Sequence, residues 1–260
     1  MAINSPVAAW YTPYIDGMAL SYATTTTLTV AAGTATNGNA VANTNIITIP
    51  AAVTISTTVV GAGGLDVGTI AASTKYYVYA IGSSSNYAAA ANTQQVYTNP
   101  YPGSALISTS TTPSLPLNYD MYRYIGSVYT TSGSVFEPFR QYGNGTERTM
   151  MYVTAVAELS GGTSATYANI DVDSSIPKVG LQAILKVAVT PTAAADACHI
   201  LPYGVTSTNG FVTVSGDVAA VVNTVTGQLC AAVSNAGVAT LQYKVTGAVT
   251  ISVQGYIDLV

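Results

Sequence analysis

The chain has 260 residues, of which only 7% are charged, and its formal net charge is −4. This length suits one or two domains with hydrophobic cores of their own. The acidic balance argues against nucleic-acid binding, which needs a basic stripe to displace counterions, and it gives no attraction to anionic membranes.

The residues at the start of the sequence do not predict a signal for export or membrane insertion. Residues 1–17 have neither a basic start nor a continuous apolar core, so we expect synthesis in the cytoplasm without a secretory signal. The long uncharged stretch from Gly17 to Leu65 is rich in Thr, Asn and Gly, and no 18-residue window in it is uniformly apolar. We therefore expect no membrane insertion.

Short strand-like runs rich in Thr, Val, Ile and Tyr follow one another along the chain, separated by Gly, Asn and Pro clusters. Regular spacing of such runs is typical of β-sandwiches and barrels, and no segment shows a convincing helical period. The sequence therefore predicts an all-β fold. The runs are Leu28–Ala32, Asn45–Ile49, Ala52–Val60, Lys75–Ile81, Met121–Thr130, Arg148–Leu159, Leu181–Thr190, Phe211–Gly216, Ala239–Thr246 and Val249–Val260.

The composition predicts a division into two units. We expect a β-rich unit over residues 1–150, a connecting segment over 151–178, and a C-terminal, jelly-roll-like β-sandwich over 179–260. The stretch from Glu158 to Lys178 is rich in Gly, Ser and Thr, as in a connection. Beyond it, Phe211–Ser215 and Val249–Val253 alternate apolar and polar residues, which is typical of sheets with one solvated face.

All three arginines of the chain, Arg123, Arg140 and Arg148, lie in or just after the stretch from Leu115 to Gly145, which also holds five tyrosines. Within it, residues 119–130 read as a strand, "TTSGS" as a turn, and "VFEPF" as a returning strand, with Pro138 marking an edge or a bulge. Alternation assigns two faces to the first strand: Tyr119, Met121, Arg123, Ile125, Ser127 and Tyr129 on one, and Asp120, Tyr122, Tyr124, Gly126 and Val128 on the other.

Two interpretations of this hairpin are open. The one we favour is structural: Arg123 pairs with Asp120 and Arg140 with Glu137, which would lock the turn region. In the other, the arginines and the tyrosine rings that can stack on them bind a ligand. The candidate ligand or packing residues are Tyr119, Tyr122, Arg123, Tyr124, Tyr129, Arg140 and Tyr142.

The stretch from Leu106 to Gly145, "LISTSTTPSLPLNYDMYRYIGSVYTTSGSVFEPFRQYGNG", resembles a module common in tail fibre and virion structural proteins of tailed bacteriophages, with the pattern "PxxPxxYDxxRxIGS" followed by "FxQxG". Residues 28–37 and 61–81 resemble the module's upstream segments, and "VTISVQGYIDLV" resembles the last strand of the β-rich domain that often follows. The chain departs from the pattern at Tyr124, where the family often has a second Arg, at Arg140, and in a longer "YTNPYPGSA" region.

The resemblance implies a non-enzymatic protein on the surface of a tailed-phage virion, assembled in the bacterial cytoplasm. It also implies a homotrimer, whose interfaces would bury Tyr and Val faces that a monomer could not keep in water. Two roles are open: a short tail fibre or adhesin that binds a host surface glycan, or a head decoration protein that cements the capsid. In either role, other capsid or tail proteins would be partners.

Catalytic and metal-binding patterns are weak. Cys198 and His199 are neighbours on a predicted strand and would point to opposite faces, so we do not expect a nucleophile with its base. With Cys230 they form no recognised zinc site, and free buried thiols are favoured over a disulfide. No cofactor or metal is expected.

Carboxylates leave two remote alternatives. A polysaccharide depolymerase would need two facing carboxylates, for which Glu137, Glu147 and Glu158 are candidates without a supporting motif. Asp171 and Asp173 share one face of an extended segment and could help to bind Ca²⁺, although no further oxygen ligands follow at a fixed spacing.

Overall fold

The computed structural model describes residues 14–38, 46–84, 102–143, 145–177, 180–193, 196–205, 212–215, 221–232 and 239–260. Regular structure in this part of the chain consists of β-strands, and no α-helix occurs in it. The predicted all-β class is therefore confirmed. Nothing within the described ranges is a helix long and apolar enough to cross a bilayer.

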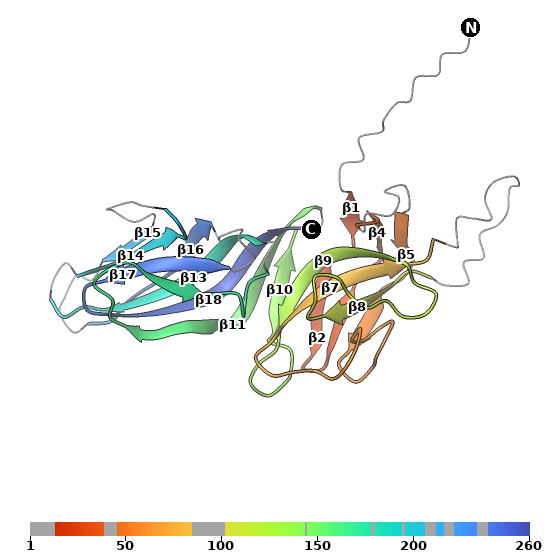
Figure 1. Ribbon diagram of the computed structural model, residues 1–260, viewed down its shortest axis with the longest axis horizontal. Helices are drawn as coiled ribbons and strands as arrows, with labels where there is room; N and C mark the ends of the chain where they lie inside the picture. The colour runs from red at the N-terminus through yellow and green to blue at the C-terminus, as the bar shows by residue number, and fades with distance from the viewer. Residues whose placement is uncertain are drawn as a thin grey trace, which may run out of the picture.

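The N-terminal unit contains three antiparallel sheets (Figure 1). Its strands pack their apolar faces into one core, in which Leu28, Ile55, Val78 and Ile107 are fully buried. In sheet order the strands are β1 (Ile15–Gly17), β4 (Gly33–Thr36) and β5 (Ile46–Ile49); β2 (Leu20–Thr24), β3 (Thr27–Val30) and β6 (Val53–Ser56); and β8 (Ser104–Ser108), β7 (Lys75–Gly82) and β9 (Met121–Tyr129).

The C-terminal unit is a sandwich of two antiparallel sheets (Figure 1). Side chains from both sheets, among them Val187, Ile200, Leu241 and Ile251, are fully buried in the same continuous apolar cluster that forms the core of the N-terminal unit. One sheet has the order β10 (Phe139–Tyr142), β11 (Glu147–Gly162), β18 (Ala248–Leu259), β13 (Gly180–Thr190) and β16 (Asn223–Ala232). The other has the order β12 (Ala168–Asp171), β17 (Thr240–Val245), β14 (Ala197–Pro202) and β15 (Val212–Ser215).

The strand order of this sandwich is that of a jelly roll. If β11 is counted as strand 1 and β18 as strand 8, the two sheets read 1-8-3-6 and 2-7-4-5, with β10 added at the outer edge of the first. Two interleaved Greek keys produce this arrangement. The predicted jelly-roll-like sandwich is therefore confirmed. The expected alternation of burial is clear in β15, whereas in β18 Ile251, Ser252 and Val253 are all buried.

The predicted boundaries of the sandwich are wrong. Its eight jelly-roll strands begin at Glu147 rather than at 179, and the added edge strand β10 begins at Phe139. Most of β11 and all of β12 lie in the expected connecting segment 151–178. The strand β11 has 16 residues and pairs along β18, which begins only at Ala248. Its Thr, Ser and Gly residues suggested a linker, yet Thr and Ser also suit the exposed face of a pleated strand.

The predicted hairpin exists only at its tip. Thr130 bridges Phe136, and the Glu137 N–H donates to the Tyr129 carbonyl at 2.8 Å. At Pro138, which has no N–H to extend this ladder, the chain leaves for the other unit, where β10 pairs with β11. Along its length, β9 instead pairs with β7 of the N-terminal unit.

A bulge changes the faces of β9 halfway along it. The register with β7 shifts between Val78 and Tyr79, opposite Gly126, whose φ of 142° is in the region that favours glycine. A Cβ at this glycine would lie 2.9 Å from Leu20 Cδ1. Ile125 enters the main core, and so does Val128, which strict alternation places on the opposite face.

Candidate functional site

The two units meet in a buried polar interface, which we call the seam. It consists of Lys75, Tyr124 and Ser127 from the N-terminal unit and of Arg148, Tyr152, Val172–Ile176, Tyr256 and Asp258 from the C-terminal unit. These residues come from β7 and β9 on one side and from β11, β18 and the loop after β12 on the other. Three charged residues of the seam, Lys75, Arg148 and Asp258, are buried.

Arg148 is the largest fully buried side chain, with only 2% of its surface exposed. Its guanidinium donates to the carbonyls of Gly17 at 2.7 Å, Met18 at 2.8 Å and Ile125 at 3.1 Å, all in the N-terminal unit, and its Nε donates to Gly145 O at 3.1 Å. Burial lowers the pKa of Arg148 to about 10, against the opposing effects of Tyr124 and Asp258. The side chain therefore stays cationic and ties both units together through backbone oxygens.

Asp258 lies opposite Arg148 in the pairing of β11 with β18 and is 1% exposed. The Tyr124 hydroxyl donates to its Oδ2 at 2.5 Å, whereas Oδ1 is buried without a hydrogen-bond partner. Burial raises the pKa of Asp258 to about 6, although Tyr124, the Leu259 backbone and Arg148 all favour the ionised form. The pKa of Tyr124 is raised well above its usual value, first by burial and then by Asp258, so the phenol keeps its proton.

Two tyrosines of the C-terminal unit complete the middle of the seam. The Tyr256 hydroxyl donates to Ser127 O at 2.8 Å and accepts from the Ser127 N–H at 3.1 Å. The Tyr152 hydroxyl donates to Ser175 O at 2.8 Å, and its ring meets that of Tyr129 with centroids 6.3 Å apart. Each buried hydroxyl thus has a backbone partner, which removes most of the cost of burying it.

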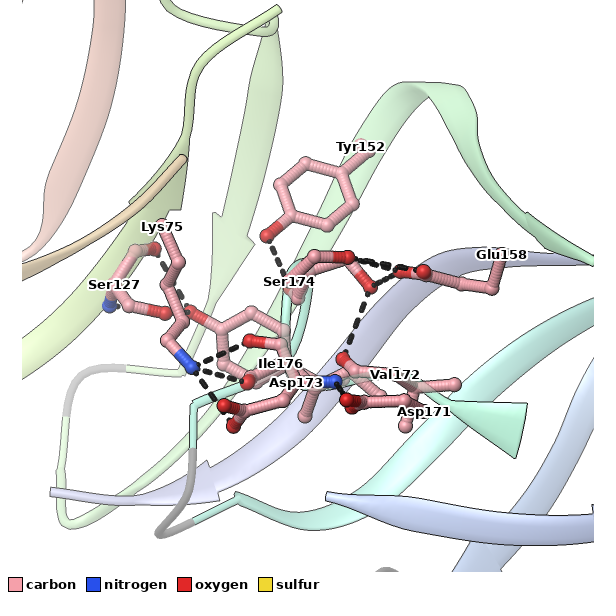
Figure 2. A network of polar contacts seen from close by, with 11 residues as sticks. Lys75, Ser127, Tyr152, Glu158, Asp171, Val172, Asp173, Ser174 and Ile176 are labelled. Atoms are coloured by element: carbon pink, nitrogen blue, oxygen red, sulfur yellow. Dashed lines mark hydrogen bonds and ion pairs between the residues drawn. The ribbon is translucent and has the colours of Figure 1, made fainter. Parts of the chain in front are cut away.

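Lys75 crosses the seam at its other end (Figure 2). Its Nζ donates to Asp173 O at 2.6 Å and to Ile176 O at 2.9 Å, and it forms an ion pair with Asp173 Oδ1 at 3.2 Å. Asp171 in turn accepts the Asp173 N–H through Oδ1 at 2.8 Å. An ammonium therefore occupies the place where the sequence allowed Ca²⁺, and no group of three or more metal-ligating side chains occurs within the described ranges.

Glu158 of β11 supports the same loop from the other side (Figure 2). The Ser174 hydroxyl lies 2.9 Å from both of its carboxylate oxygens, and the Ser175 hydroxyl also donates to it. Burial raises the pKa of Glu158, and the two serines oppose this effect. The loop Val172–Ile176 is thus fixed by Lys75, Tyr152 and Glu158 together.

The ion pairs predicted for the hairpin are not formed. Asp120 accepts from the Ser84 N–H at 2.6 Å and from its hydroxyl, and Glu137 accepts from the Thr154 N–H at 3.0 Å. Arg140 is exposed, while Nε of Arg123 is buried without a partner. Within the described ranges, Lys75 and Asp173 form the one ion pair.

The seven residues proposed as one ligand or packing site do not come together. Tyr119, Tyr122 and Tyr124 pack with Tyr77 and Tyr79 in a second apolar cluster; the Tyr79 and Tyr122 rings meet edge to face with centroids 5.5 Å apart. Tyr129 instead faces the seam. Arg140 and Tyr142 lie apart from these rings on β10, where both are exposed. Four of the five tyrosines are therefore engaged in packing, and Tyr142 is exposed.

Cys198 and His199 point to opposite faces of β14, as predicted. Cys198 is a free, fully buried thiol whose burial raises its pKa to about 12, while His199 Nδ1 lies 3.2 Å from Thr213 Oγ1 on the outer face. This geometry offers no nucleophile with its base. The side chain of Cys230 lies outside the part that the structure describes.

Replacing Lys75 with methionine is expected to lower the free energy of unfolding by about 2 kcal/mol. The substitution keeps the length of the side chain but leaves the oxygens of Asp173 and Ile176 without their buried donor. Urea unfolding followed by circular dichroism measures the loss. The same substitution at the exposed Lys186 is the control and should change stability by less than about 0.5 kcal/mol; equal losses in the two variants would contradict this role of Lys75.

No family model, curated protein or solved structure matches the chain.

Proposed function

We propose that the chain is a non-enzymatic structural protein on the surface of a tailed-phage virion, in the form of a homotrimeric short tail fibre or receptor-binding adhesin. The observation that carries this proposal is the use of the buried ionisable groups. Contacts between the two β units are made by Lys75, Arg148 and Asp258. The loop Val172–Ile176, which Lys75 contacts, is also held by Glu158. The use of these groups in holding a fixed shape supports a structural role over a catalytic one.

The fold of the C-terminal unit supports the same proposal. Jelly rolls are frequent in viral capsid proteins and in lectins, so this architecture suits both a place on a virion and recognition of a glycan. Fold alone does not define function. The proposal therefore also rests on the resemblance of residues 106–145 to the phage module, and on a net charge of −4 with few basic residues, which disfavours nucleic acid as a partner.

A head decoration protein that cements the capsid is the alternative. Large apolar side chains are exposed on both units, such as Leu117 at 87% and Val153 at 65%. Together with a charged fraction of 7%, they favour extensive burial against neighbouring virion proteins. In this role the jelly roll would contact capsomers instead of a receptor.

A capsule depolymerase is a remote third candidate. Of the three carboxylates considered for it, Glu137 and Glu158 are engaged by Thr154 and by two serines, and Glu147 is exposed. If the chain were a depolymerase, single Gln substitutions at these glutamates would abolish release of sugar from host capsule. We expect no release by the wild-type protein.

Labelling intact virions with gold-conjugated antibody against this chain tests the proposal. Gold at the tail tip or baseplate is the expected result for an adhesin, and gold over the head would establish the decoration role. Virions without any gold, in a preparation where antibodies to a known capsid protein do bind, would contradict both. Light scattering at micromolar concentration should give the mass of three chains.

A further inference from the structure

On the outer face of the first jelly-roll sheet, the part formed by β10, β11 and the end of β18 carries large apolar side chains, with Thr149 among them and the exposed Gln182 beside Ile257. Tyr142 of β10, Val153 of β11 and Leu259 of β18 are 55%, 65% and 50% exposed. Met151 and Ile257 lie between them and are half-buried. The pairing registers place these side chains on one side: Tyr142 lies opposite Thr149 and Thr149 opposite Ile257, while Met151 lies in the next row.

The opposite face of the same strands is already used. Met150, Tyr152 and Tyr256 point inward and are at most 2% exposed. Since successive residues of a strand alternate between faces, the apolar outer side chains cannot turn into this core. An antiparallel sheet with one packed face usually carries polar residues on the other, and contiguous exposed apolar side chains mark an interaction surface.

Two opposite charges border this outer face. Arg140 lies in the row of Met151, and Glu147 lies in the row of Leu259, four residues away along β11. At 3.3 Å per residue the two rows are about 13 Å apart, too far for the charges to pair within one chain. Both side chains are exposed, and neither belongs to the ion pair found within the described ranges.

We infer that this outer face binds a second copy of the chain, with Tyr142, Met151, Val153, Ile257 and Leu259 at the centre and Arg140 of one copy paired with Glu147 of the next. Because the two borders carry opposite signs, the Arg140 border of one copy complements the Glu147 border of the next, whereas a partner of a single charge would be repelled at one end. Repetition of the contact around a closed ring yields a symmetric oligomer. The inference rests on the proposed homotrimer and identifies its interface.

A charge-swap experiment tests the pairing directly. Arg140→Glu and Glu147→Arg are each expected to weaken self-association at least tenfold, because each variant brings like charges together at every contact. The double variant R140E/E147R restores opposite charges and is expected to recover the wild-type assembly. Sedimentation equilibrium across a range of protein concentrations measures the association constant, with circular dichroism to confirm that each variant is folded.

Leu117→Lys is the matched control for Val153→Lys. Both positions are highly exposed and apolar, but Leu117 lies between β8 and β9 of the N-terminal unit and is not part of the sheet that carries this face. Val153→Lys should weaken self-association at least tenfold and Leu117→Lys should not change it. The interface inference fails, while the homotrimer stands, if the wild-type protein is an oligomer that Val153→Lys leaves intact. It also fails if R140E/E147R associates no more tightly than the single variants. A wild-type protein that is monomeric would remove both.

Discussion

Arg148→Ala is expected to lower the free energy of unfolding by about 3–5 kcal/mol. The substitution leaves the carbonyls of Gly17, Met18 and Ile125 without donors, opens a cavity at the seam, and removes the positive charge next to the buried carboxylate of Asp258. Urea unfolding followed by circular dichroism at pH 7 measures the change.

Lys186→Ala provides the control, because Lys186 is exposed, is not one of the residues proposed for self-association, and its removal should cost less than about 0.5 kcal/mol. Arg148→Lys keeps the charge but cannot reproduce the fork of donors that reaches three carbonyls, so an intermediate loss is expected. A loss below about 1 kcal/mol for Arg148→Ala would contradict the role given to this residue. If the alanine variant does not fold, the free energy of unfolding of Arg148→Lys can still be compared with that of the control.

Asp258→Asn is expected to remove a dependence of stability on pH. The pKa of Asp258 is raised from 3.8 to about 6, so the folded protein holds this proton more tightly than the unfolded chain. Protonation therefore stabilises the fold fully below pH 3.8, and this contribution is lost as pH rises through about 6. At 1.36 kcal/mol per pKa unit, it amounts to about 3 kcal/mol.

The measurement compares wild type and variant by urea unfolding at several values between pH 4 and pH 8. The free energy of unfolding of the wild type should fall relative to that of Asp258→Asn as pH rises, since the amide keeps an oxygen for the Tyr124 hydroxyl but cannot ionise. Glu158, whose pKa is also raised, contributes equally to both proteins and drops out of the difference. Parallel curves would show that Asp258 does not titrate in this range.

The seam explains why the arginines gather where they do. Arg148 joins the two units and Arg123 lies next to it, close enough to lower its pKa. Arg140 stands on the opposite, outer face of β10. The three arginines are close in sequence because the chain passes from the N-terminal to the C-terminal unit between β9 and β10, and arginines lie before and after this passage. They do not form a single binding site.

Local patterns predicted the strands but not their partners. The runs 75–81, 121–130, 181–190 and 249–260 all lie largely within observed strands, because Val, Ile, Thr and Tyr fit a pleated surface wherever it pairs. Pairing depends on distant segments. The sequence from Tyr119 to Phe139 has every local mark of a hairpin, yet β9 finds its long partner in β7 and β10 joins β11.

The seam could be predicted only in part. Arginine and lysine are rarely buried, so Arg148 and Lys75 were not expected inside. A signal was present in each case. Arg148 shares its face of β11 with Met150 and Tyr152, and Lys75 begins a strand whose seven remaining residues are all apolar, Tyr or Gly. Asp258 likewise alternates in step with the buried Tyr256. None of these patterns shows which carbonyl or hydroxyl will face the charge.

Differential scanning calorimetry tests most directly the claim that the seam makes the two β units one cooperative structure. We predict a single transition whose calorimetric enthalpy equals the van't Hoff enthalpy. Arg148→Ala should lower its midpoint or split it into two, because the units then lose their main polar connection. Two separate transitions in the wild-type protein, with enthalpies that match the two units, would contradict the account.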